Sequence, residues 1–267
     1  MKSIAPAVAA LLMVALPTYA QWEKSPTSAF PRTSGGTPNL SAPAPKAPDG
    51  KIDLSGVWQP DANPNGKPQG VENQVFSQYF VNVAADLPQG AAPMQPSAEA
   101  LFRQRLQNRG KDAPAAHCKP SGVPIVNSLP IPYKIVQTPR LIMILYEENT
   151  IFRQIFLDGR QPVKDPEPRW MGYSTGKWDG DTLVVATIGI NDQTWLDGMG
   201  HPHSDSMHLT ERFRRRDAGH LEVEVTIDDP KSYSKPITYT QKATIRPDEE
   251  LLEYFCTENE KDIPLYK

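Results

Sequence analysis

The alternation of apolar and polar residues along the second half of this 267-residue chain is the feature that most limits its fold. Residues 221–228 read Leu-Glu-Val-Glu-Val-Thr-Ile-Asp, and residues 237–240 continue the pattern with Ile-Thr-Tyr-Thr. A period of two places successive side chains on opposite faces of a strand, so each such segment predicts a half-buried β-strand. We expect nine strands from Tyr133 onwards, at 133–137, 141–147, 150–157, 170–178, 182–190, 207–216, 221–228, 237–246 and 251–256.

Short turn signals such as Asp179-Gly180-Asp181 and Asp217-Ala218-Gly219 separate these segments. Short turns join antiparallel neighbours, and no alternation of strands with helices is present to suggest a parallel sheet. Closing an antiparallel meander removes its exposed edges. The sequence therefore predicts a mainly β fold, an antiparallel meander that closes into a barrel or forms a strongly bent sheet.

A further strand is expected before the meander. Residues 53–58, Asp-Leu-Ser-Gly-Val-Trp, contain a Gly56-x-Trp58 motif that resembles the first strand of lipocalin-like (calycin) barrels. The resemblance implies that Trp58 plugs the closed end of such a barrel.

Proline divides the chain into two regions, because 18 of its 28 prolines lie between residues 21 and 139. Residues 21–50 are rich in Pro, Ser, Gly and Ala and predict a disordered tether. Residues 51–267 form a single β domain, in which 51–132 wrap around the meander of 133–256. The wrapping segment contains two expected helices. One has an apolar face of Val71, Val75, Phe76, Tyr79, Phe80 and Val83, and the other runs from a capping Ser97 to Asn108 and carries Leu101 and Leu106.

The first twenty residues resemble a secretory signal peptide. Lys2 precedes an apolar run from Ile4 to Leu16, and Ala20 is a suitable residue before a cleavage site. An uncleaved anchor is the alternative. No later segment has 18 consecutive apolar residues, so we expect no membrane span and a periplasmic or secreted protein.

Two cysteines in an exported protein suggest one disulfide, between Cys118 and Cys256, although two buried free thiols would also fit. The formal net charge of −3 disfavours a nucleic-acid-binding groove.

Several longer motifs occur in order along the chain. They are Arg-Gln-Ile-Phe-Leu-Asp-Gly-Arg at 153–160, Trp-Met-Gly-Tyr-Ser at 170–174, Trp-Asp-Gly-Asp-Thr-Leu-Val-Val at 178–185, and Pro-His-Ser at 202–204 followed by Glu-Arg-Phe-Arg-Arg at 211–215. Together they resemble a large group of exported bacterial proteins without a settled activity. The resemblance covers about residues 50–262 and implies a shared fold and an exported location, but it assigns no catalytic residue.

Three of the five histidines, His201, His203 and His208, fall within eight positions. His201 and His203 would share one side of an extended chain, with His208 at the start of the next strand, so a transition-metal site is one hypothesis. Asp205, Glu211 or His220 would have to complete it. A plain solvated loop is the other, because Pro202 and several turn-forming residues lie in the same segment. We expect no cofactor, with a bound transition metal left open.

Two charged residues occupy positions where the strand pattern predicts an inward, apolar face. Glu211 alternates with Leu209 and Phe213, and Arg153 alternates with Ile151 and Ile155. Buried charges need a partner, so we expect Arg153 and Glu211 to pair. Such a pair would either brace the barrel or take part in acid/base chemistry with His203 and Asp192.

Aromatic and charged residues near the expected strand ends are candidates for binding a ligand. They are Tyr146, Asp158, Arg160, Trp170, Tyr173 and Trp195. The leading hypothesis is an exported barrel that binds a small, largely apolar molecule. The alternatives are a lyase, isomerase or hydrolase that uses Glu211 and His203, and an interaction module held by the tether.

Overall fold

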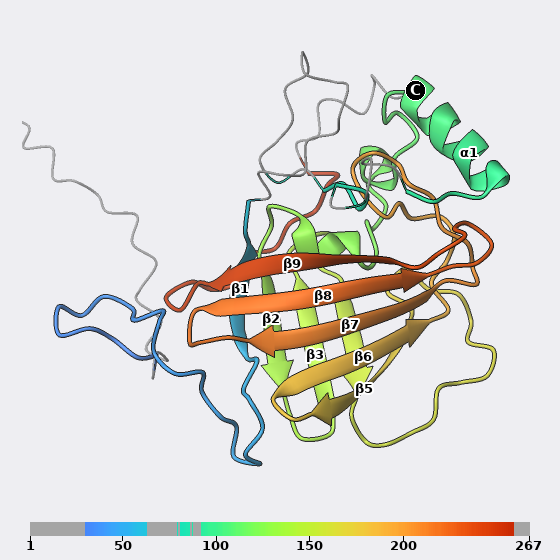
Figure 1. Ribbon diagram of the computed structural model, residues 1–267. Helices are drawn as coiled ribbons and strands as arrows, with labels where there is room; N and C mark the ends of the chain where they lie inside the picture. Colours follow the sequence, from blue (N-terminus) through green and yellow to red (C-terminus); the bar gives the residue numbers. More distant parts are fainter. Residues whose placement is uncertain (1–29, 63–78, 80, 86, 88–91, 259–267) are drawn as a thin grey trace, which may run out of the picture.

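The computed structural model describes residues 30–62, 79, 81–85, 87 and 92–258. Nine strands close into one barrel and follow each other around it in chain order, so the predicted mainly β barrel is confirmed (Figure 1). The strands are β1 (Gly56–Pro60), β2 (Tyr133–Gln137), β3 (Leu141–Tyr146), β4 (Phe152–Phe156), β5 (Tyr173–Asp179), β6 (Thr182–Ile188), β7 (His208–Arg215), β8 (His220–Asp228) and β9 (Ile237–Ile245).

Eight of the nine expected strands are present, each within three residues of its expected bounds, and β1 adds the strand expected from the Gly56-x-Trp58 motif. The expected strand at 251–256 is wrong. In that segment Tyr254 makes only an isolated bridge with Glu148. The barrel closes without it, because β9 pairs with β1 through Trp58 and Ile245.

One pair of neighbouring strands departs from the expected antiparallel order. β4 and β5 are parallel and share only two register pairs, Ile155 with Ser174 and Phe156 with Thr175. Parallel neighbours need a long connection, and residues 157–172 provide one. This stretch contains Pro162, Pro166 and Pro168 and no strand or helix. It returns the chain to the end of the barrel where β4 starts, so β5 runs in the same direction as β4.

The helical elements lie at one end of the barrel (Figure 1). Helix α1 (Pro96–Gln107) confirms the second expected helix, but Ser97 lies inside its first turn and no side chain caps it. Leu101 and Leu106 are exposed. Two 3-10 helices follow, η2 (Pro114–His117) and η3 (Ile125–Ser128). Of the first expected helix, residues 71–78 and 80 lie outside the described residues.

Trp58 fills the barrel end where β2 joins β3 and β7 joins β8, as the motif implies. The side chain is fully buried, and its indole Nε1 donates to the Leu54 carbonyl at 3.0 Å. The guanidinium of Arg215 lies 5.0 Å from the centre of the indole ring and donates to the carbonyls of Asp53 and Ala218. Burial lowers the pKa of Arg215 to about 10.

The described part of the expected tether, residues 30–50, lies against this same end instead of standing free. The amides of Ala218 and Gly219 donate to the carbonyls of Ala42 and Leu40, at 2.8 and 2.7 Å. Phe30 and Leu40 pack against the hydrophobic core. Main-chain bonds to the β7–β8 turn thus order a segment whose composition alone predicts disorder.

The opposite end is covered by η3 and by the segment 189–207. The expected disulfide is confirmed there, between Cys118 and Cys256, with Cα atoms 5.3 Å apart. It links the segment after η2 to the segment that follows β9, over a separation of 138 residues. In the described part of the chain, no helix is long and apolar enough to cross a membrane.

Candidate functional site

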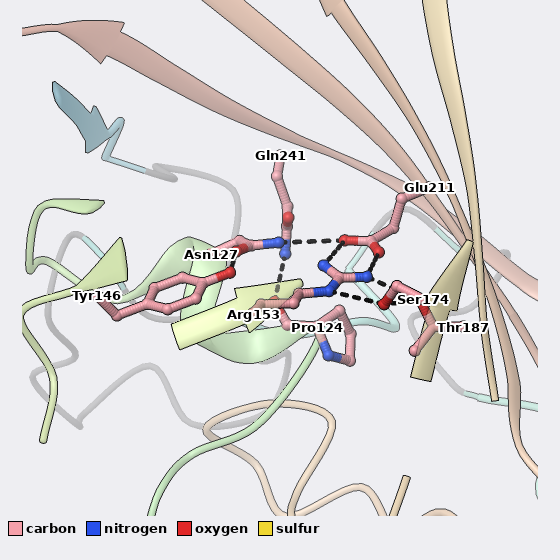
Figure 2. Close-up of polar contacts among 8 residues, drawn as sticks. All are labelled: Pro124, Asn127, Tyr146, Arg153, Ser174, Thr187, Glu211 and Gln241. Carbon is pink, nitrogen blue, oxygen red and sulfur yellow. Dashed lines mark hydrogen bonds and ion pairs between the residues drawn. The ribbon is translucent and has the colours of Figure 1, made fainter. Parts of the chain in front are cut away.

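A buried ion pair lies in the interior of the barrel (Figure 2). Arg153 of β4 and Glu211 of β7 are 1% and 0% exposed, and both nitrogens at the end of the guanidinium donate to the Glu211 carboxylate. Arg153 Nε also donates to Ser174 Oγ at 3.1 Å, and Nη2 donates to Thr187 Oγ1 at 2.8 Å. The expected pairing of Arg153 with Glu211 is therefore present, and two inward hydroxyl groups complete it.

The covering helix η3 also contributes a hydrogen bond to this pair. Asn127 Nδ2 donates to Glu211 Oε1 at 3.1 Å, and the Tyr146 hydroxyl donates to Asn127 Oδ1 at 2.7 Å. Burial alone would lower the pKa of Arg153, but the adjacent Glu211 and Tyr146 outweigh it and raise the pKa. Burial also raises the pKa of the Tyr146 phenol, so that hydroxyl stays a hydrogen-bond donor.

Gln241 of β9 ties η3 to the barrel wall. Its Nε2 donates to the Pro124 carbonyl at 3.1 Å. Its Oε1 is buried and has no hydrogen-bond partner in the described part of the chain. We call this group of buried side chains the polar centre: Asn127, Tyr146, Arg153, Ser174, Thr187, Glu211 and Gln241. It joins strands β3, β4, β5, β6, β7 and β9 to the segment that closes this end.

The barrel wall separates between β4 and β5, beside Arg153. Their ladder begins only at Ile155, because the chain bends at Gly172, immediately before β5. Gly172 has φ +61°, and a Cβ there would lie 2.7 Å from Thr187 Cγ2 and 2.9 Å from the Ile188 carbonyl oxygen. Glycine thus allows the backbone at 172 to approach β6 closely.

A pocket of about 280 Å³ opens at this separation, and we call it the seam pocket. One side is β4 with the preceding Ile151, and the other is residues 169–174. Its walls are mainly apolar, and Arg153 and Ser174 of the polar centre also line it. The apolar and aromatic side chains that line it are Pro120, Ile151, Phe152, Phe156, Trp170, Met171 and Tyr173.

Two of the expected ligand-binding residues, Trp170 and Tyr173, line the seam pocket. Asp158 and Arg160 lie at its rim, beside Phe156. The rings of Phe156 and Tyr173 are 5.5 Å apart, and Arg160 stacks 3.8 Å from the Phe156 ring centre. A hydrogen bond from Arg160 lowers the pKa of Asp158 to about 2. The rim is therefore held by an ion pair over an aromatic ring.

The remaining candidates lie elsewhere. Tyr146 belongs to the polar centre. Trp195 lines a separate apolar pocket of about 250 Å³ beside η2 and η3, with Arg105 5.0 Å above its ring. Asp192 lines a polar hollow next to the seam pocket, and the two share Arg169 and Trp170.

The three clustered histidines point to different partners. His201 bonds to Asp197 at 2.6 Å and stacks on Phe102, and His203 Nε2 shares a hydrogen with Thr194 Oγ1 at 2.6 Å. His208 is exposed at the start of β7. Within the described residues no group of three or more His, Cys, Asp or Glu side chains could hold a metal ion. The expected solvated loop is also wrong, because His201 and His203 are buried and hydrogen-bonded, and of the three histidines only His208 is exposed.

The grouping of His203, Glu211 and Asp192 does not assemble through hydrogen bonds among the described residues. His203 contacts Thr194 and the Ser204 carbonyl, and Glu211 contacts Arg153 and Asn127. Asp192 acts on His203 only through its charge, and burial is the main effect that lowers the pKa of His203.

Several residues of the polar centre and of the seam pocket were not predicted from the sequence. Ser174 and Thr187 could have been found as Glu211 was, because they are polar residues at inward strand positions. Asn127 lies in a proline-rich segment without a periodic pattern and gave no signal.

Comparison with known proteins adds no assignment. No protein-family model matches the chain, and no curated protein or solved structure is significantly similar to it.

Proposed function

We propose that this protein is an exported barrel that binds a small, largely apolar molecule in the seam pocket. The observation that carries the proposal is the pocket itself, about 280 Å³ with mainly apolar walls and its inner surface at the polar centre. Ligand pockets are typically apolar and contain a few fixed polar groups. The pocket is slightly smaller than a typical site for a drug-sized ligand, so the ligand is a compact molecule.

An exposed aromatic side chain, Phe152, supports ligand binding at the seam pocket. Phe152 is 56% exposed although it belongs to a strand, and it lies at the mouth of the seam pocket. Covering such a ring with an apolar ligand contributes about 25 cal/mol for each Å² removed from water.

An exported location fits the disulfide, since such bonds persist in oxidising compartments. The signal-peptide segment lies outside the described residues. A periplasmic or secreted location, cleavage near Ala20 and membership of the exported bacterial group belong to this proposal.

An acid/base enzyme is the less well supported alternative. Such an enzyme needs a carboxylate free to exchange a proton with a substrate. Both oxygens of Glu211 already accept hydrogen bonds from Arg153, and one also accepts from Asn127. These contacts favour a bracing role for the pair.

Two measurements test the proposal. The purified protein is incubated with an extract of its natural surroundings, and any retained compound is identified by native mass spectrometry. Separately, affinity for naphthalene is measured for the wild type, Phe152→Ser and the control Leu252→Ser. Leu252 is 50% exposed and does not line the seam pocket.

We expect a retained apolar compound, and we expect Phe152→Ser to weaken naphthalene binding about fivefold or more, from the apolar contact area lost. Leu252→Ser should bind like the wild type. No retained compound together with equal affinity in all three proteins would refute the proposal.

A further inference from the structure

The seam pocket lies along an exposed main-chain edge of β4. Tyr146 N donates to the Ile151 carbonyl, and Leu157 N donates to the Arg140 carbonyl, both at 2.9 Å. Main-chain groups of successive strand residues point to alternate sides. Odd-numbered residues of β4 therefore face β3, and even-numbered residues face β5. Gln154 and Phe156 flank the Ile155–Ser174 pair, and the N–H and C=O of Phe152 lie beyond it and face the seam.

The ladder between β4 and β5 does not reach Phe152. It consists of the pairs at Ile155 and Phe156, and in the described part of the chain no other strand pairs with β4 on that side. A strand edge with unpaired N–H and C=O groups is a template for an added main-chain or amide partner. Here that edge lies directly beside the apolar walls of the seam pocket.

We propose that the ligand of the seam pocket carries a secondary amide next to a bulky apolar group. The N–H of that amide donates to the Phe152 carbonyl, the carbonyl of a second amide one carbon away accepts from the Phe152 N–H, and the apolar group on the carbon between them enters the aromatic pocket. This inference rests on the proposed function and names the class of ligand. The volume of about 280 Å³ suits one apolar group rather than several residues, so the occupant is a small amide such as an acylated amino-acid amide.

The first test uses a matched pair of ligands on the full-length protein. N-acetyl-phenylalanine methylamide has the required N–H, and O-acetyl-phenyllactic acid methylamide has an ester oxygen in its place. Calorimetry should show that the amide binds about 2- to 10-fold tighter, the worth of one hydrogen bond. Equal affinities would overturn the inference and leave apolar binding intact.

The second test removes the donor from the protein. Phe152→Pro lacks both the ring and the N–H, whereas its control Phe152→Ala lacks only the ring. Proline is tolerated at the first residue of an edge strand, and a thermal melt checks that both variants fold. We expect the proline variant to bind the amide about 2- to 10-fold more weakly than the alanine variant. Equal binding by two folded variants contradicts the main-chain contact.

The remaining outcomes separate this inference from the proposed function. If naphthalene binds and neither phenyl ligand does, the amide class is wrong and the pocket stands. If no apolar probe binds, both fail. If a seven-residue peptide centred on phenylalanine binds more than tenfold tighter than the single-residue amide, the occupant is an extended chain and not a small molecule.

Discussion

Replacement of Glu211 by Gln tests the role of the polar centre most directly. The substitution keeps the shape of the side chain and removes its charge, which leaves the buried Arg153 guanidinium without a counter-ion. Both residues are almost completely buried, so water cannot replace the carboxylate. Breaking one partner of a buried pair costs about 3–5 kcal/mol.

This loss is large compared with the total stability of a typical domain, about 5–15 kcal/mol. At about 2–4 °C for each kcal/mol in a protein of this size, Glu211→Gln should lower the melting temperature by about 6–20 °C. The hydroxyls of Ser174 and Thr187 still accept hydrogen bonds from Arg153, which places the expected value nearer the lower bound.

The assays are a thermal melt for the melting temperature and urea unfolding for the free energy of unfolding, both followed by tryptophan fluorescence at pH 7 with the disulfide intact. Glu222→Gln is the matched control, because Glu222 pairs with Arg216 on the barrel surface at 3.0 Å. Exposed pairs contribute at most about 1 kcal/mol. If Glu211→Gln destabilises the protein no more than this control, the buried pair of Arg153 and Glu211 does not stabilise the barrel.

Three further changes have outcomes that the structure determines. Gly172→Ala places a methyl group against Thr187 and the Ile188 carbonyl in a left-handed backbone, so it should destabilise by about 2–4 kcal/mol in urea unfolding; a loss below 0.5 kcal/mol would show that the bend relaxes freely. Replacing Cys118 and Cys256 together by Ser frees a loop of 138 residues and should lower the free energy of unfolding by up to about 4–5 kcal/mol, and an unchanged melting temperature would contradict this. Burial lowers the pKa of His203, so the unfolded chain binds more protons below its own pKa of about 6.5, and stability should fall as the pH drops through that value. The slope should be smaller in His203→Gln, and an equal slope would show that other groups cause it.

Much of the barrel could be predicted from local pattern. Strands β6, β7, β8 and β9 alternate apolar and polar residues, so strand identity follows from neighbouring residues, and the short turn between β7 and β8 also fixes their antiparallel order. The connection from β6 to β7 is the long segment 189–207, whose sequence fixes no such order. The expectation failed where sequence distance is large. The local sequence at 251–256 cannot show whether this segment pairs with another strand. The strand that closes the barrel against β9 is β1, nearly two hundred residues earlier.

The candidate sites divide in the same way. Arg153 and Glu211 were recognisable because a charge at an inward strand position needs a partner, and that rule applies within one strand. The seam pocket depends on the parallel β4–β5 contact, which the long connection 157–172 allows but its sequence does not dictate. Trp170 and Tyr173 were candidates as residues, but no pattern showed that they face an open edge of β4.

Side-chain period and residue type were enough to predict eight of the nine expected meander strands, the two inward charges and which two cysteines could pair. How the barrel closes, where its wall separates and how residues 30–50 lie against it emerge only in the folded chain. The physical reason is that hydrogen bonds between distant main-chain segments depend little on side-chain identity. The hydrogen bond between Gly219 N and the Leu40 carbonyl is an example, because it forms only when the whole chain is folded.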